Sequence, residues 1–381
     1  MRIILSSLQS PERYSIAPYE FWRTYFVRGL EEAGHQVLEV PEVDWVEGLV
    51  CPHDDSLKAW RAQIWERVHA FVRRELERGP IHMFLSYLFP QQVETSAIDE
   101  LQRRGIPCVN FFCDNVREFR RVPREYTPFA LHWVPEFEAL SLYRMAGLPH
   151  IHAPMPCWIP AELRQVTKVE AEPPTFIGSF DVLRHELFAN ALSKGAEIIL
   201  RGSGWATDVK PNEKPSLRCL VPNQLALIRS QGLRGLYYKL ERRLRPLRSV
   251  TIPVGAIGSP LHGSEYFRVT REARVVIGVN RVPTMKASNR RPLTYSRLRD
   301  IEAPMLGACY LTEWTEGITA LYDLGTEIET YQTVDELVYK IDELSGNSYR
   351  RTAMRKQAQR RALCNHSVAR TIARICEKLG V

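Results

Sequence analysis

RVVIGVN (residues 274–280) and SRLRDIEAPMLGACYLTE (residues 296–313) are the two stretches that decide the fold. β-Branched residues crowd the first stretch, which predicts a buried strand. The second stretch places Leu298, Ile301 and Met305 on one stripe of a helix, and after a glycine it continues into an apolar run. The two stretches therefore predict a strand, a short helix and a second strand.

One face of this expected helix carries a cation and a carboxylate, because Arg299 and Glu302 stand three positions apart. Ser296 is expected to cap the first turn of the helix. A cation and a carboxylate at a helix start, beside a strand end, suit a ligand that has both phosphates and hydroxyls. An ordinary solvated ion pair explains the same spacing, so both interpretations stay open.

The same alternation of strands and helices runs through both halves of the chain. Strands are expected near residues 2–7, 37–41, 82–88, 108–114, 131–135, 150–156, 175–180, 197–202, 250–254, 274–280, 307–312 and 327–331. A stretch rich in Pro, Glu and Lys at residues 157–174 predicts a linker. Amphipathic helices between apolar strands favour parallel sheets that are covered on both faces. We therefore predict an α/β fold with Rossmann-like domains at residues 1–157 and 175–365.

The composition is typical of a globular protein, and 381 residues suit two domains of about 150 to 200 residues each. The sequence shows neither a signal peptide nor an apolar run long enough to span a membrane, which favours a cytoplasmic location. The eight cysteines form no CxxC pair and no ligand cluster. This scatter predicts reduced thiols and no structural metal.

The net charge of +7 is concentrated in residues 221–250, where seven cations accompany one carboxylate. A basic stripe along the whole protein would indicate a nucleic-acid ligand, and this distribution does not. The segment also contains Leu, Ile and Tyr, so one interpretation is peripheral contact with the anionic inner surface of a membrane. A solvated helix or an oligomer contact is the alternative.

Short motifs with a common likeness follow one another along the chain. They are FCDN at residues 112–115, FIGS at 176–179 with Arg184, RDIEAP at 299–304, GA at 307–308, LTE at 311–313, LGTEI at 324–328 and the final Arg361, His366 and Arg370. This ordered series resembles the CgeB-like (spore-maturation) glycosyltransferases, a group of the GT-B sugar transferases.

The resemblance implies the GT-B architecture, with two Rossmann-like domains and a cleft between them. It places the acceptor site in residues 1–157 and the site for a nucleotide-sugar donor in residues 175–365. It also implies that a last helix at residues 366–381 returns to the first domain. It implies transfer of a sugar from a nucleotide-diphosphate sugar to an acceptor hydroxyl, with no metal and no further cofactor. The acceptor would be a carbohydrate, a lipid-linked molecule or a protein.

The resemblance also suggests donor-site residues. GT-B transferases place a glycine and a cation at the spacing of Gly178 and Arg184, beside the donor diphosphate. A departing diphosphate gains negative charge, which a fixed cation stabilises, although a surface ion pair is the alternative for Arg184. Glu302 resembles a carboxylate that holds ribose hydroxyls, but the companion carboxylate of that motif is replaced by Thr294. Further donor-binding candidates are Ser179, Gly202, Gly204, Trp205, Asn280 and Ser296.

Trp205 could stack on a base or simply pack beside an ordinary turn. On the acceptor side, Asp114 ends an apolar strand, where it could bind or deprotonate an acceptor hydroxyl. Helix capping is the alternative for Asp114 and for Asn115. Tyr87 joins Asn115 as an acceptor-side candidate, and Asp114, Arg184 and Arg299 are the predicted catalytic residues.

Two other functions fit the same residues. One is a GT-B enzyme of another type, a nucleotide-sugar epimerase or a phosphorylase. The other is a catalytically silent partner protein that binds a nucleotide or sugar, which the missing carboxylate at Thr294 keeps open.

Overall fold

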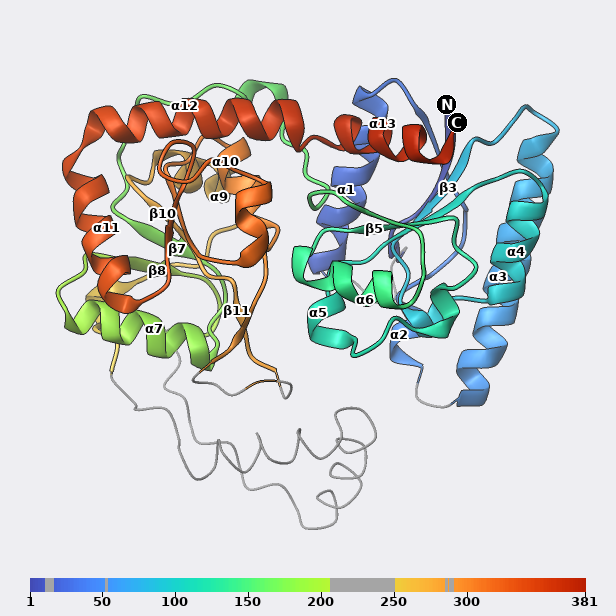
Figure 1. The fold of residues 1–381 in the computed structure, drawn as a ribbon, viewed down its shortest axis with the longest axis horizontal. Coiled ribbons are helices and arrows are strands. Elements are labelled where there is room, and N and C mark those ends of the chain that lie inside the picture. Colours follow the sequence, from blue (N-terminus) through green and yellow to red (C-terminus); the bar gives the residue numbers. More distant parts are fainter. Residues whose placement is uncertain (11–16, 52–53, 206–250, 285–286, 288–290) are drawn as a thin grey trace, which may run out of the picture. The chain divides into compact units, whose positions relative to one another are not determined.

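The structure is a computed structural model that describes the chain except for residues 11–16, 52–53, 206–250, 285–286 and 288–290 (Figure 1). The basic segment at residues 221–250 lies outside the described residues. The chain divides into two compact units, Met1–Ala161 with Ala362–Val381, and Glu162–Arg361. Each unit contains a six-stranded parallel sheet. The predicted α/β fold with two parallel sheets is confirmed.

The sheet of the first unit has the strand order β2-β1-β3-β4-β5-β6. Its strands are β1 (Arg2–Ser6), β2 (Gln36–Glu39), β3 (Met83–Ser86), β4 (Cys108–Phe111), β5 (Leu131–Val134) and β6 (His150–His152). The helices are α1 (Ala17–Glu32), α2 (Glu47–Val50), α3 (Asp54–Leu76), α4 (Thr95–Arg103), α5 (Asn115–Glu118), α6 (Leu140–Met145) and α13 (Val368–Leu379). The central strands β3, β4 and β5 are buried throughout, as expected for strands covered on both faces.

The last helix, α13, belongs to the first unit and lies beside α1 (Figure 1). A Cβ atom on Gly29 of α1 would lie 2.5 Å from the Cβ atom of Val368, so the two helices pack closely. Ile372 and Ile375 continue the buried face of α13. The chain therefore begins and ends in the same unit.

The sheet of the second unit has the order β14-β13-β10-β7-β8-β9. Its strands are β7 (Thr175–Ile177), β8 (Ile199–Arg201), β9 (Ile257–Gly258), β10 (Val276–Gly278), β13 (Tyr310–Glu313) and β14 (Glu329–Tyr331), and β11 (Arg281–Val282) and β12 (Leu293–Thr294) form a small antiparallel pair. The helices are α7 (Val182–Ser193), α9 (Gly263–Glu272), α10 (Arg299–Met305), α11 (Val334–Gly346) and α12 (Ser348–Asn365).

The strand predicted at residues 250–254 is wrong. The edge strand of this region is β9 (Ile257–Gly258), and Val254–Ala256 forms a 3₁₀ turn before it. Pro253 immediately precedes that turn, and a proline has no N–H to donate to a neighbouring strand.

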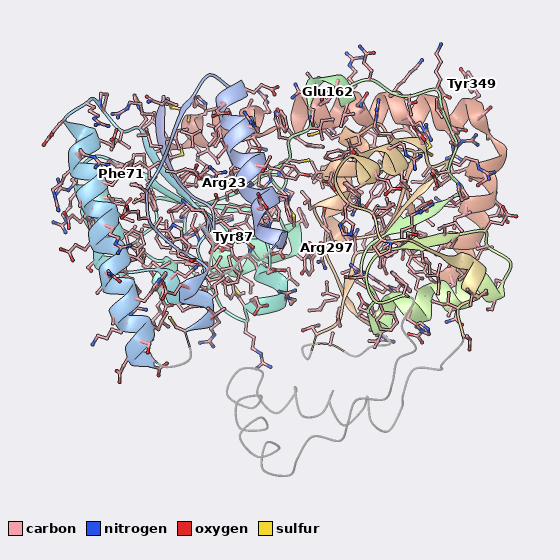
Figure 2. The ribbon with its side chains drawn as sticks, turned by 180° about the vertical axis from the view of Figure 1, so that it is seen from behind. Arg23, Phe71, Tyr87, Glu162, Arg297 and Tyr349 are labelled. Atoms are coloured by element: carbon pink, nitrogen blue, oxygen red, sulfur yellow. The ribbon has the colours of Figure 1, made fainter. Side chains whose placement is uncertain are left out.

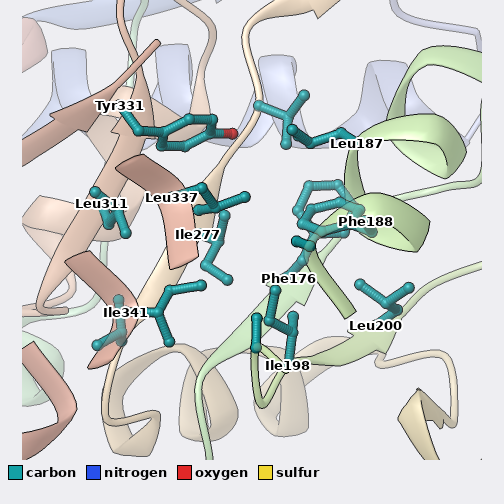
Figure 3. Packing of buried hydrophobic residues seen from close by; sticks show 14 of the residues in the cluster. Phe176, Leu187, Phe188, Ile198, Leu200, Ile277, Leu311, Tyr331, Leu337 and Ile341 are labelled. Atoms are coloured by element: carbon teal, nitrogen blue, oxygen red, sulfur yellow. The ribbon is translucent and has the colours of Figure 1, made fainter. Parts of the chain in front are cut away.

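The core of the second unit joins the sheet to its helices (Figure 3). Phe176 of β7 and Ile277 of β10 belong to one buried cluster with Phe188 of α7 and Leu337 of α11. Burying large apolar side chains in this way stabilises the fold by about 1.5–3 kcal/mol for each of them. The cluster holds β7 and β10 together, and so fixes the edge at which these two parallel strands end.

Candidate functional site

Four neighbouring strands of the second unit end at the same edge of the sheet. β8 pairs with β7, β7 with β10 and β10 with β13, all in parallel. Ligand sites of open parallel sheets lie outside the carboxyl ends of the strands. The predicted donor residues Gly178 and Gly202 immediately follow β7 and β8, and Asn280 lies two positions after the end of β10.

The loops after β7 and β8 touch each other through their glycines. A Cβ atom on Gly202, whose φ is +150°, would lie 2.2 Å from the carbonyl oxygen of Gly178. That oxygen accepts a hydrogen bond of 2.7 Å from Trp205 Nε1, and Gly204 turns the chain between them with φ +85°. The indole of Trp205 is buried edge-on against Phe176. The structure therefore favours the packed tryptophan over the predicted stacking on a base.

Arg184 lies at the start of α7 and reaches back to the loop after β7. Its Nη1 donates to the carbonyl oxygen of Ser179 at 2.8 Å, and its Nε lies 3.1 Å from a carboxylate oxygen of Asp181. Burial lowers the pKa of Arg184, and the positive charges of Arg297 and Arg299 lower it further. Three guanidinium groups are thus near enough to repel one another, which an anionic ligand would relieve.

Arg299 and Glu302 occur together at the start of α10, with a tyrosine between their charged groups. Arg299 Nη1 donates to Tyr266 Oη, which in turn donates to Glu302 Oε2. Arg299 Nη2 donates at 3.3 Å to the carbonyl oxygen of Ile177, the last residue of β7. Sequence reasoning missed Tyr266, because it lies on α9 and 33 positions before Arg299.

The start of α10 is fixed by a buried carboxylate. Asp300 accepts hydrogen bonds of 2.8 Å from Tyr310 Oη and from Thr312 Oγ1, both on β13. It also accepts one of 3.0 Å from the backbone N–H of Arg297, and Ser296 is a further partner. Burial raises the pKa of Asp300. These contacts attach the first turn of α10 to the sheet.

The prediction that Ser296 caps this helix is wrong. The helix begins at Arg299, and the N-cap position is held by Leu298 without a side-chain hydrogen bond. Ser296 lies too far upstream to cap the helix, and it is buried beside Asp300 instead. Its predicted contact with a donor stays a prediction.

Asn280 joins the end of β10 to the end of β13. Its Nδ2 donates to Thr312 Oγ1 at 3.2 Å and to the carbonyl oxygen of Glu313 at 2.8 Å, while its buried Oδ1 has no hydrogen-bond partner among the residues that the structure describes. Glu313 accepts from Arg281 Nε at 2.8 Å. Burial lowers the pKa of Arg281, but the hydrogen bonds and charge of Glu313 outweigh this and raise it. This part of the strand edge is rigidly paired.

In the first unit the acceptor-side candidates separate into one accessible residue and two buried ones. Asp114 is 20% exposed, does not cap α5 with its side chain and forms an ion pair of 3.3 Å with Arg117. Asn115 is buried, donating from Nδ2 to Phe112 O at 2.6 Å and accepting from Tyr143 Oη at 2.7 Å. The structure therefore favours a packing role for Asn115.

Tyr87 is the second buried acceptor-side candidate. It lies in the interior of the first unit (Figure 2), with its hydroxyl 3.2 Å from Cys113 Sγ. Its ring packs edge-on against Phe111 and Trp22. These contacts favour a core position for Tyr87 too.

Glu136 is a second carboxyl group near Asp114, from the loop that follows β5. It is fully buried, and Oε2 accepts a hydrogen bond of 3.2 Å from the backbone N–H of Val116. Burial and the charge of Asp114 raise the pKa of Glu136 to about 8. At neutral pH this carboxyl group is therefore mostly protonated, while Asp114 is the accessible carboxylate of the two.

Within the part of the chain that the structure describes, no group of three or more His, Cys, Asp or Glu side chains is arranged to hold a metal ion. The seven cysteines in the described ranges are free thiols. No helix within those ranges is both long and apolar enough to cross a membrane.

The family model described as "Glycosyl transferase-like" matches residues 239–377. Sucrose-phosphate synthase from Thermosynechococcus elongatus is similar in structure, with a TM-score of 0.60, 12% identity and coverage of 100% of this chain and 98% of that chain. Anabaena HepE in complex with UDP-glucose is also similar, with a TM-score of 0.53 and 12% identity, and the match covers 100% of this chain and 99% of that chain. AviGT4, a glycosyltransferase involved in avilamycin A biosynthesis, has a TM-score of 0.52 and 14% identity, and the match covers 100% of this chain and 97% of that chain. No curated protein matches the sequence.

The two parallel sheets and these structural likenesses define the GT-B fold, as the sequence predicted. The family-model match adds the class for the stretch that it covers: residues 239–377 are similar to glycosyltransferases. Arg299, Glu302 and Tyr266 lie inside the matched stretch, whereas Arg184 and Asp114 lie outside it.

Proposed function

We propose that this glycosyltransferase moves a sugar from a nucleotide-diphosphate sugar to an acceptor hydroxyl and stabilises the leaving diphosphate with arginines instead of a metal ion. One observation carries the proposal. Arg184 from α7 and Arg299 from α10 both donate to carbonyl oxygens of the short segment at residues 177–179, immediately after β7. Two guanidinium groups fixed on one backbone segment at a strand edge form a site for a bridging anion.

The chemistry requires such an anion site. As the glycosidic bond to the donor breaks, negative charge accumulates on the diphosphate, and cations that are already in place stabilise it without reorganisation. The N-terminus of α7 contributes little, because Asp181 accepts from the backbone N–H groups of Leu183 and Arg184 at 2.9 Å each. Phosphate binding therefore depends mainly on the arginine side chains.

The comparisons support a nucleotide sugar as donor, since Anabaena HepE is described in complex with UDP and with UDP-glucose. Within this proposal Glu302 binds ribose hydroxyls, and Asp114 binds or deprotonates the acceptor hydroxyl. The acceptor is a carbohydrate, a lipid-linked molecule or a protein. The ordered motifs support membership of the CgeB-like group, and peripheral membrane contact through residues 221–250 stays a prediction from sequence.

Thermal-shift measurements with UDP, ADP, GDP and dTDP test donor binding, because a ligand of the folded state raises the melting temperature. We expect one of them to stabilise the protein, and the corresponding labelled nucleotide sugars to be turned over in the presence of EDTA. Loss of turnover in EDTA that returns with a divalent ion would contradict metal independence. Turnover without an acceptor would indicate an epimerase, and binding without turnover would indicate the silent partner protein that Thr294 keeps open.

A further inference from the structure

Tyr266 lies between the two charged groups that the proposed function assigns to the donor nucleotide. Its hydroxyl accepts from Arg299 Nη1 and donates to Glu302 Oε2. The guanidinium carbon of Arg299 also lies 4.7 Å from the centre of the tyrosine ring, a cation–π arrangement. One side chain therefore contacts both the cation and the carboxylate.

The tyrosine and its two partners come from two different helices, because Tyr266 is on α9 whereas Arg299 and Glu302 are on α10. On α9, Thr270 Oγ1 donates at 2.7 Å to the carbonyl oxygen of Tyr266, and Thr270 and Val269 are fully buried. Arg299 is held from its other side by the carbonyl oxygen of Ile177. The backbone position of Tyr266 is therefore set within α9, from which its hydroxyl reaches the two side chains of α10.

Without the hydroxyl, the cation and the carboxylate would meet. Arg299 Nη1 lies 3.7 Å from Glu302 Oε2, longer than the roughly 2.7–2.9 Å of a direct charge-assisted hydrogen bond. Glu302 is only 6% exposed, so its attraction to an adjacent guanidinium is weakly screened. Removing Tyr266 Oη takes one hydrogen bond away from the carboxylate and favours closure of the pair.

We propose that Tyr266 is a positioning residue for the donor nucleotide: it holds Glu302 apart from Arg299, so that the carboxylate is kept for the ribose hydroxyls. This inference rests on the proposed function. It names a residue on α9 as the determinant that distinguishes a nucleoside diphosphate from a bare diphosphate.

The test compares Tyr266→Phe with the wild type by calorimetry, using UDP, ADP, GDP and dTDP as nucleotide probes and inorganic pyrophosphate as the probe without ribose. We expect affinity for the preferred nucleoside diphosphate to fall about tenfold, as for loss of a hydrogen bond to a charged group. Pyrophosphate binding should change less than about threefold, because Arg299 keeps its charge and its Ile177 contact. Tyr339→Phe, at a tyrosine that is 66% exposed on α11, is the matched control.

A second variant separates positioning from general damage. In a Glu302→Gln background, adding Tyr266→Phe should change nucleoside diphosphate affinity less than about threefold, since the two changes act through one contact. Equal losses for both probes, or wild-type nucleotide affinity in Tyr266→Phe, would overturn the inference while the proposed function stands. If the wild type itself binds none of the nucleotides, the proposed function fails and the inference fails with it.

Discussion

Arg184 is the cation whose surroundings best suit a departing diphosphate. It is 16% exposed, lies in the first turn of α7 with its guanidinium group against the loop after β7, and is near two further arginines. We expect Arg184→Ala to lower kcat by on the order of 100-fold, because the charge that stabilises the leaving group is lost. The variant should remain folded, since Asp181 caps α7 with its own carboxylate. Steady-state turnover of the labelled donor measures the effect.

Two comparisons sharpen the Arg184 experiment. Arg184→Lys keeps the charge but lacks the planar fork of donors, so its kcat should lie between those of the wild type and Arg184→Ala. Arg360→Ala removes an exposed arginine from α12 and should leave turnover unchanged. A folded Arg184→Ala variant with wild-type kcat would remove the assigned role.

Glu136 makes stability depend on pH. Its pKa is about 8 in the folded protein against an ordinary value of 4.5, so between these values the folded state binds more protons than the unfolded state. The free energy of unfolding therefore falls as pH rises through this window. His132 acts in the opposite direction only below its ordinary pKa of 6.5, because burial lowers its folded pKa to about 3. Urea unfolding between about pH 6.5 and 8.5 isolates the effect of Glu136.

The isosteric variant Glu136→Gln is the control for this pH effect. It cannot ionise, so its stability should change less with pH over that window than the stability of the wild type. Parallel pH profiles for the two proteins would show that Glu136 titrates normally in the folded state.

Single residues show where the site could be predicted from sequence. Arg184, Arg299 and Glu302 follow strand ends or start helices, and topology alone brings such positions to one edge of a sheet. Tyr266 has no local signal, because its partners come from a different helix. Asn115 follows the same apolar run as Asp114, and sequence could not show that its amide is buried.

At the scale of elements, the order of strands and helices was predictable and several boundaries were not. The strand expected from residue 307 begins at Tyr310, because Gly307 has φ +76° and ends α10. The backbone N–H groups of Gly307 and Ala308 donate to Pro304 and Ala303, a common form of helix termination. A glycine before an apolar run fits a strand start and a helix end equally well in sequence.

Helix α12 is joined to the segment before β7 by an ion cluster in which two buried arginines share a carboxylate that is 22% exposed. Glu170 accepts from Arg351 Nε at 3.0 Å and lies 3.3 Å from Arg355 Nη2. The two arginine side chains are 5% and 2% exposed. Glu170→Ala should lower the free energy of unfolding by about 3 kcal/mol, because it leaves two buried guanidinium groups without their carboxylate.

Urea denaturation measures this loss against a surface ion pair of the same unit. Lys194 and Asp335 lie 2.7 Å apart but are 50% and 79% exposed. Asp335→Ala should therefore cost less than about 1 kcal/mol. Similar losses in the two variants would show that the buried cluster contributes no more than an exposed pair.

At the scale of the whole molecule, the two units have separate sheets and separate cores, so a ligand held by one unit should stabilise that unit first. Hydrogen exchange measured with and without a saturating nucleoside diphosphate tests this. We expect slower exchange at residues 176–184 and 297–302, with α4 (Thr95–Arg103) of the first unit as the internal reference. At a concentration of 100 Kd the stabilisation is about 2.7 kcal/mol, which slows exchange in stable segments roughly 100-fold. Protection at α4 without protection at residues 176–184 or 297–302 would place the nucleotide in the first unit. The arginines that donate to residues 177–179 would then bind a different ligand.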